Sequence, residues 1–217
     1  MRLKNVKNAK MILEQGKYYV KNASDYKGKW SNYFNNDNPI YIEIGTGKGN
    51  FIIKNAINNP DINYIGIEKF DSVLVRAIQK SNDLEVDNLK FIRMDAENIL
   101  DVFDKEVDKI FLNFSDPWPK DRHAKRRLTS PIFLNKYKAI FKDDVIIEMK
   151  TDNIDLFNYS YETLLQNNYE IVYLTNDLHN ENVDNITTEY EEKFASKGIK
   201  INKLIAISKN KNGNEEH

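Results

Sequence analysis

Short apolar runs and longer amphipathic segments alternate along most of this chain. Each apolar run ends at polar or glycine residues, and the segments between them repeat apolar positions at the three- and four-residue spacing of a helix. Strands that alternate with helical segments of about 10 to 15 residues indicate an α/β sheet, mostly parallel, with helices on both faces. The expected strands cover residues 40–44, 63–68, 89–94, 109–113, 145–150, 169–174 and 199–207, and the expected helices cover residues 51–57, 71–80, 96–103, 131–141 and 153–165.

The two ends of the chain depart from this alternation. The last two expected strands have no helical pattern between them, which predicts an antiparallel edge strand in a seven-stranded sheet. Residues 178–198, which separate them, form a long irregular segment of the kind that is usually functional. We expect residues 1–38 to form an arm packing on or flanking a single domain at 39–208, and the polar residues 209–217 to form a disordered tail.

The composition excludes several classes of protein. The 217 residues suffice for one domain with a sizeable core. The chain has no cysteine, which excludes disulfides and thiolate chemistry, and its three histidines have no metal-binding spacing, so we expect no metal. No apolar run approaches the roughly 20 residues of a membrane span, and the N-terminus lacks a signal-peptide core. A cytoplasmic protein without a membrane partner is therefore expected, as a monomer or a homodimer.

Acidic residues recur where the expected strands end. Glu43 and Glu68 lie within or at the end of the first two strands, and Asp95, Asp116 and Asp152 follow the next three. Parallel α/β sheets bind ligands at the carboxyl ends of their strands, so these carboxylates are expected to converge on one rim. Asp95 and Asp152 each precede a helical pattern, and helix N-capping explains either of them equally well.

The glycine loop Gly45–Gly49 follows the first expected strand. Asn50 stands where a dinucleotide fingerprint requires glycine, and the Walker A pattern is absent. Glycines allow close approach of the backbone to a ligand, so Gly45 and Gly47 are expected to bind a cofactor. The acidic rim favours S-adenosylmethionine, which carries a sulfonium and an amino-acid head and no pyrophosphate. Glu68 would then accept hydrogen bonds from its ribose hydroxyls, and Asp95 from its adenine amino group.

A sharp turn and a basic segment follow the fourth strand. Asp116 and Trp118 alternate with Pro117 and Pro119, whose fixed φ angles restrict the loop. Residues 120–127 carry a local charge of +4 in a chain of net charge −1. If this segment is helical, Arg122, Lys125 and Arg126 share a face that could follow a phosphate backbone; a solvated charged face is the alternative. Basic residues among the first ten, Arg2, Lys4, Lys7 and Lys10, form a second patch.

Together these segments resemble the bacterial tRNA (guanine-N7)-methyltransferases of the TrmB type, which are class I, Rossmann-like enzymes that use S-adenosylmethionine. The similarity covers nearly the whole chain and rests on residues 42–49, 113–120, 122–128, 150–153 and 188–191. The glycine loop is shared by many methyltransferases, whereas the second and third segments together are specific.

The resemblance also implies roles for single residues. Glu43, Glu68, Asp95 and Asp116 would line the cofactor site, with Asp116 as the catalytic position. The target would be the guanosine at position 46 of the tRNA variable loop. Substrate contacts are implied for Lys120, Asp152, Thr188 and Glu191, and RNA contacts for the segment 122–127, with phosphate contacts expected of Arg122, Lys125, Arg126 and Arg127.

Three rival functions fit parts of the pattern. A nicotinamide-dependent oxidoreductase keeps the fold but needs the missing glycine and has no use for the basic segment. A non-enzymatic RNA-binding protein would have no function for Glu43, Glu68 and the glycine loop. An RNA methyltransferase acting on an exocyclic amine is the nearest competitor, because an Asp-Pro-aromatic turn also suits removal of a proton from an amino group.

Overall fold

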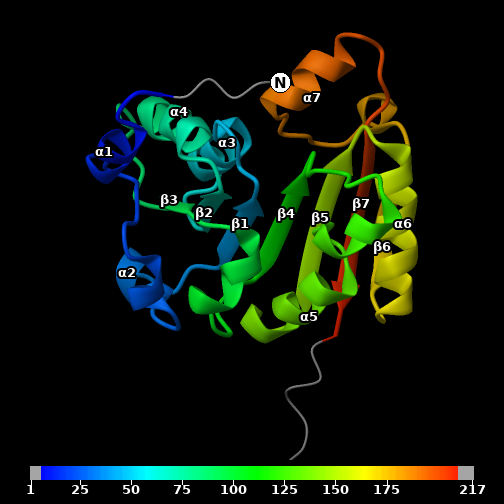
Figure 1. The fold of residues 1–217 in the computed structure, drawn as a ribbon, viewed down its shortest axis with the longest axis horizontal. Helices are drawn as coiled ribbons and strands as arrows, with labels where there is room; N and C mark the ends of the chain where they lie inside the picture. The colour runs from blue at the N-terminus through cyan, green and yellow to red at the C-terminus, as the bar shows by residue number, and fades with distance from the viewer. Residues whose placement is uncertain (1–5, 210–217) are drawn as a thin grey trace, which may run out of the picture.

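The computed structural model describes residues 6–209, which fold around one seven-stranded sheet (Figure 1). The strand order is β3-β2-β1-β4-β5-β7-β6. Strands β1 to β5 pair in parallel, whereas β7 runs antiparallel to both of its neighbours, β5 and β6. The predicted fold class is confirmed, with the antiparallel strand lying one position inside the β6 edge. The strands are β1 (Ile40–Ile44), β2 (Asn63–Glu68), β3 (Leu89–Arg93), β4 (Lys109–Asn113), β5 (Val145–Thr151), β6 (Glu170–Thr175) and β7 (Asn202–Ser208).

Helices cover both faces of the sheet because successive strand residues point to opposite sides. Tyr64, Phe91 and Phe111 pack in one cluster with α1, α3 and α4, and Ile42 and Ile110 pack in the other with α2, α5 and α6. The α-helices are α1 (Ala9–Glu14), α2 (Trp30–Phe34), α3 (Asn50–Asn58), α4 (Asp71–Ser81), α5 (Pro131–Ile140), α6 (Ile154–Gln166) and α7 (Glu189–Ala195). The 3₁₀ helices are η1 (Ala23–Tyr26), η2 (Ala96–Asp101), η3 (Asp121–Arg126) and η4 (Leu178–Asn180).

The parallel register brings the carboxyl ends of the strands to one edge. Ile44 pairs with Ile67, and Asn113 at the end of β4 pairs with Lys150 near the end of β5. Figure 1 shows the arrowheads of β1, β4 and β5 pointing the same way, with α7 beyond the ends of β4 and β5. The polar residues that follow these strands therefore share one rim of the sheet.

Residues 6–38 pack against the β3 side of the sheet and the η2 region. The Tyr18 carbonyl accepts from the Phe91 N–H at 2.8 Å, and the Val20 N–H donates to the Phe91 carbonyl at 2.9 Å. The fully buried Trp30 donates from its indole N–H to the Val102 carbonyl at 3.0 Å. The domain boundary at residue 39 stays a prediction. The basic residues Arg2 and Lys4 and the expected tail beyond Lys209 lie outside the described residues.

Two segments differ from the sequence-based expectation. Residues 178–198, expected to be irregular, contain α7, which begins with a capping box formed by Thr188 and Glu191. Residues 121–126 form a 3₁₀ helix instead of an α-helix. Three residues per turn align Arg122 with Lys125 but rotate Arg126 away from them, so the three-residue face that an α-helical segment would present does not form.

Candidate active site

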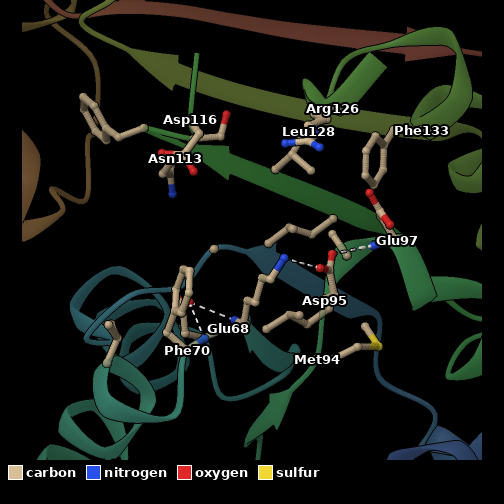
Figure 2. Close-up of a pocket in the computed structure, with 18 of the residues that line it drawn as sticks. Glu68, Phe70, Met94, Asp95, Glu97, Asn113, Asp116, Arg126, Leu128 and Phe133 are labelled. Carbon is tan, nitrogen blue, oxygen red and sulfur yellow. Dashed lines mark hydrogen bonds and ion pairs between the residues drawn. The ribbon is translucent and has the colours of Figure 1, made fainter. Parts of the chain in front are cut away.

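A cavity of about 660 Å³ opens at the carboxyl ends of β1, β2 and β4 (Figure 2). Glu68, Asp95 and Asp116 line it, so three of the five predicted carboxylates meet at one site. Figure 2 shows Glu68 and Asp95 on one side of the cavity and Asp116 on the other. The wall is therefore acidic on both sides.

Glu68 ties the glycine loop to the end of β2. One of its carboxylate oxygens accepts from the Gly47 N–H at 3.1 Å, and the other accepts from the N–H groups of Lys69 and Phe70 at 2.8 and 3.0 Å. Burial raises the pKa of Glu68 above its ordinary value although these three donors favour the ionised form. The carboxylate that faces the cavity thus also fixes the loop beside it.

The glycine loop requires glycine for two different reasons. Gly47 and Gly49 adopt the left-handed backbone conformation, with φ of +60° and +78°. Gly49 also begins α3 against α4, where a Cβ atom would lie 2.8 Å from the Ala77 Cβ. Gly45, at φ +81°, lines the cavity and leaves open space where a side chain would stand.

Glu43 lies beneath the cavity and does not line it. It is 2% exposed; it accepts from the Thr46 hydroxyl at 2.6 Å and from the Asn113 amide N–H at 2.9 Å. Burial raises the pKa of Glu43 to about 7, against the effect of these two hydrogen bonds. Glu43 therefore links the glycine loop to the end of β4.

Asn113 is a site residue that the sequence analysis missed. It lines the cavity, and its buried amide oxygen has no hydrogen-bond partner among residues 6–209. A buried acceptor without a partner is uncommon and marks a position where a ligand donor would be stabilised. Its place as the polar residue that ends the fourth strand is the sequence signal that could have found it.

The helix N-capping role that the sequence left open for Asp95 and Asp152 is found for Asp95 but not for Asp152. Asp95 caps η2 by accepting from the Glu97 N–H at 3.1 Å, and its other oxygen lies 2.5 Å from the Lys69 ammonium (Figure 2). Partial burial opposes ionisation of Asp95, but the hydrogen bonds from Lys69 and Glu97 and the Lys69 charge outweigh it and lower its pKa. Asp152 is not a cap, because Asn153 caps α6.

Asp116 lies on a turn with two strained positions. Its side chain is exposed, and the turn leaves β4 through a hydrogen bond from the Phe114 N–H to the Lys150 carbonyl at 2.8 Å. Phe114 and Trp118 have positive φ angles of 52° and 43°, which bulky residues rarely adopt. The Arg126 guanidinium lies 4.9 Å from the centre of the Trp118 ring and lines the cavity.

The basic residues after the turn fall into two groups. The side chains of Lys120, Arg122 and Lys125 are exposed and make no hydrogen bond or ion pair within residues 6–209. Arg127 is half-buried, and its guanidinium donates to the carbonyls of Pro117 and Trp118. Of the four predicted phosphate contacts, Arg122, Lys125 and Arg126 are therefore exposed, and Arg127 faces the turn.

Helix α7 is attached to the sheet by charged side chains. Glu191 and Lys150 are both buried, with 2.8 Å between ammonium and carboxylate, and Lys150 also donates to the Ile186 carbonyl at 2.8 Å. Burial lowers the pKa of Lys150, and the Glu191 charge opposes that shift. Protein groups enclose Glu191 here, and Thr188 caps the helix. The substrate contacts implied for both residues stay predictions.

An aromatic group that the sequence analysis did not assign lies between α7 and the Asp116 turn. The Tyr190 ring stands 4.9 Å from the Phe114 ring and stacks on Phe194 at 4.2 Å. Burial raises the pKa of Tyr190, and the Asp152 charge adds to this shift. Asp152 directly follows β5 and does not line the cavity.

The hydrogen-bond acceptors of the cavity fit S-adenosylmethionine. Glu68, Asp95, Asp116 and the free Asn113 oxygen are all acceptors, as a ligand with an ammonium group, a sulfonium and ribose hydroxyls requires. Within the described part of the chain, no three His, Asp or Glu side chains are placed to hold a metal ion. None of the helices between residues 6 and 209 has the length and hydropathy needed to cross a bilayer.

Proteins with similar sequences include bacterial tRNA (guanine-N(7)-)-methyltransferases. A family model described as a methyltransferase matches residues 37–204. The tRNA (guanine-N(7)-)-methyltransferase of Lachnoclostridium phytofermentans is 52% identical over 210 residues, covering 95% of this chain and 98% of that protein. The enzyme of the same name from Bacillus subtilis is 51% identical over 192 residues, covering 88% and 90%.

Solved structures agree with the fold. An antibiotic-related methyltransferase superposes with a TM-score of 0.64 at 18% identity, covering 88% of this chain and 96% of that one. The 16S rRNA methyltransferase KamB gives a TM-score of 0.66 at 12% identity, covering 84% and 93%. The oxidoreductase and non-enzymatic alternatives are excluded by the sequence relatives. With half of its residues identical to those relatives over nearly its full length, this chain belongs to the bacterial tRNA (guanine-N7)-methyltransferase family.

Proposed function

We propose that this chain transfers the methyl group of S-adenosylmethionine to N7 of a guanosine in tRNA, and that the target is the variable-loop guanosine at position 46. The observation that carries the proposal is the position of Asp116. It lines the acidic cavity together with Glu68 and Asp95, and it lies on the same turn that leads into the exposed basic residues. A cofactor pocket and an RNA-binding surface thus share one loop.

Different cavity residues bind different groups of S-adenosylmethionine, which supplies an electrophilic methyl group when bound. Glu68 accepts from ribose hydroxyls, and Asp95 accepts from the adenine amino group. The glycine loop lets its backbone approach the ligand without a side chain in the way, and the free Asn113 oxygen is an acceptor for the ammonium group. Glu43 lies beneath the cavity and fixes the side chains of Thr46 and Asn113 by accepting a hydrogen bond from each.

Asp116 acts on the nucleobase. Guanine N7 carries a lone pair and no proton, so its methylation requires in-line approach and no general base. Asp116 accepts from the guanine N–H groups, which orients the base, and its charge offsets the positive charge that develops on the ring. The exocyclic-amine alternative would instead require Asp116 to remove a proton.

The exposed cations hold the tRNA. Lys120, Arg122 and Lys125 have free side chains next to the turn, and Arg126 stands at its base over Trp118. Phosphate contacts by such residues supply affinity without sequence preference and are weakened by salt. Asp152, which follows β5, and Thr188, which caps α7, contribute further substrate contacts. Since tRNA is the substrate, the protein acts in the cytoplasm.

The proposal is tested by incubating the purified chain with unmodified tRNA transcript and S-adenosylmethionine carrying a labelled methyl group. We expect label in 7-methylguanosine after digestion, and loss of that label when the variable-loop guanosine is replaced by adenosine. Label in a different guanosine would overturn the target position. Label in a methylated exocyclic amine would overturn the reaction, and no label despite cofactor binding would overturn the function.

A further inference from the structure

Arg127 has a different environment from the other cations of its segment. Its guanidinium donates from Nε to the Pro117 carbonyl and from Nη2 to the Trp118 carbonyl, both at 3.1 Å. The guanidinium also lies 4.2 Å from the centre of the Tyr159 ring on α6. The same group is thus fixed on one side by a helix of the core and binds the turn with two of its donors.

The turn that Arg127 contacts is strained and poorly supported by its own backbone. Phe114 and Trp118 both adopt positive φ angles. Pro117 and Pro119 have no N–H to donate. Within residues 6–209, the two bonds from Arg127 are the hydrogen bonds made by the main chain of residues 115–119. Such a conformation persists only where the surrounding structure holds it.

Arg127 itself is held in place by ordered neighbours. Its N–H donates to the Ala124 carbonyl at 3.0 Å, and the Tyr137 hydroxyl donates to the Leu128 carbonyl, also at 3.0 Å. The Ser130 hydroxyl donates to the Lys125 carbonyl at 3.0 Å. The backbone that carries the guanidinium is therefore bonded on both sides to α5 and η3.

We propose that Arg127 is a positioning residue for methyl transfer: it clamps the Pro117 and Trp118 carbonyls and so holds Asp116 toward the cofactor cavity, and it is not one of the phosphate contacts. A planar guanidinium can reach two carbonyls and stack on a ring at the same time, which an ammonium group cannot do. The effect of Arg127 on methyl transfer rests on the proposed function. Its effect on the conformation of the turn rests only on the geometry of the turn.

Arg127→Lys tests this role, because it keeps the charge and removes the fork. We expect kcat at saturating tRNA to fall about ten- to a hundredfold, since small displacements of a positioned group have effects of this size. The KM for tRNA is expected to stay within about twofold, and the salt dependence of binding to stay unchanged, because no phosphate contact is lost. Arg76→Lys is the matched control, an exposed arginine on α4 whose change should leave all three quantities as they are.

A second measurement is independent of activity. The chain has two tryptophans, Trp30, which is fully buried, and Trp118 on the turn. Acrylamide therefore quenches mainly Trp118. We expect Arg127→Lys to raise the quenching constant about twofold, whereas Arg76→Lys should not change it. Tyr159→Leu, which removes only the stacking surface, should shift kcat and quenching in the same direction by a smaller amount, and it serves if Arg127→Lys fails to fold.

The outcomes separate the two proposals. If Arg127→Lys or Tyr159→Leu leaves kcat and quenching unchanged, the positioning role is wrong. If Arg127→Lys raises the KM for tRNA and flattens the salt dependence at unchanged kcat, Arg127 is a phosphate contact after all. If the unaltered chain methylates no tRNA, the proposed function fails, while the quenching result still decides whether Arg127 holds the turn.

Discussion

The glycine loop and the Asp116 turn lie on opposite sides of one cavity but are stabilised in different ways. The loop Gly45–Gly49 takes its left-handed positions with glycines and is fixed by main-chain donors, including the N–H groups of Gly45 and Thr46, which both bond to the Ile67 carbonyl. The turn has positive φ at Phe114 and Trp118 and bonds its main chain to the Arg127 side chain. The loop therefore has glycines at its left-handed positions, whereas the turn has bulky residues at such positions and is held by one side chain.

If the conformation of the loop depends on its glycines, adding a methyl group to one of them should lower the free energy of unfolding. Gly49→Ala forces a Cβ into left-handed backbone at 2.8 Å from the Ala77 Cβ. We expect a loss of about 4 kcal/mol of unfolding free energy, the sum of backbone strain and overpacking, measured by urea denaturation.

Gly28→Ala is the matched control for this change. Gly28 also has a positive φ, +69°, but a Cβ atom at this position would have no atom beyond its chain neighbours within 4 Å. It should lose only about 1 kcal/mol from backbone strain. Equal losses in the two variants would show that the contact with α4 does not matter.

The loop also depends on Glu43 beneath it, and this dependence should vary with pH. The pKa of Glu43 is about 7 in the folded chain against an ordinary value of 4.5. Between these values the folded state binds more protons than the unfolded state, so the free energy of unfolding falls as pH rises. We expect the stability of the unaltered chain relative to Glu43→Gln to fall by up to about 3 kcal/mol from pH 4.5 to 7 and to level off above.

Urea denaturation at pH 5, 6, 7 and 8 measures this difference, because the glutamine variant does not titrate at position 43. A difference between the two proteins that stays constant over this range would mean that Glu43 is ionised in the folded chain. Titrating groups that do not interact with Glu43 cancel in the comparison.

On the other side of the cavity, Asp116→Asn should act on turnover. The amide keeps the shape and one acceptor but removes the charge, so we expect kcat at saturating tRNA to fall about a hundredfold. Asp121→Asn, an exposed carboxylate at the start of η3, is the control. Nearly full turnover in Asp116→Asn would remove the electrostatic role.

The smallest effect is expected at the exposed cations next to the turn. Arg122→Ala should weaken tRNA binding severalfold at physiological salt and reduce the slope of log affinity against log salt by about one, as the loss of one phosphate contact predicts. Filter binding at several salt concentrations measures the slope. An unchanged slope would place Arg122 outside the RNA interface, and Lys125→Ala repeats the test on the same side of η3.

The elements that the sequence predicted are those whose signals are local. Strand ends at Ile44 and Asn113, the glycine loop and the Pro-flanked turn all follow from neighbouring residues. Helix α7 was missed because it is short and charged: it is docked by pairs of Glu189 with Lys48 and of Glu192 with Lys54. Its capping box was a local signal that could have found it.

The sequence by itself determined the α/β fold, the rim on which Glu68, Asp95 and Asp116 meet, and the basic segment beside it, because strand periodicity and parallel pairing fix these positions. Only the tertiary structure decided which side chains face the cavity. It placed Glu43 beneath the wall, enclosed Glu191 with Lys150, and directed Arg127 to the turn while Arg122 stayed exposed. Neighbouring cations look alike in sequence, and their roles differ only through partners such as Tyr159 that lie far along the chain.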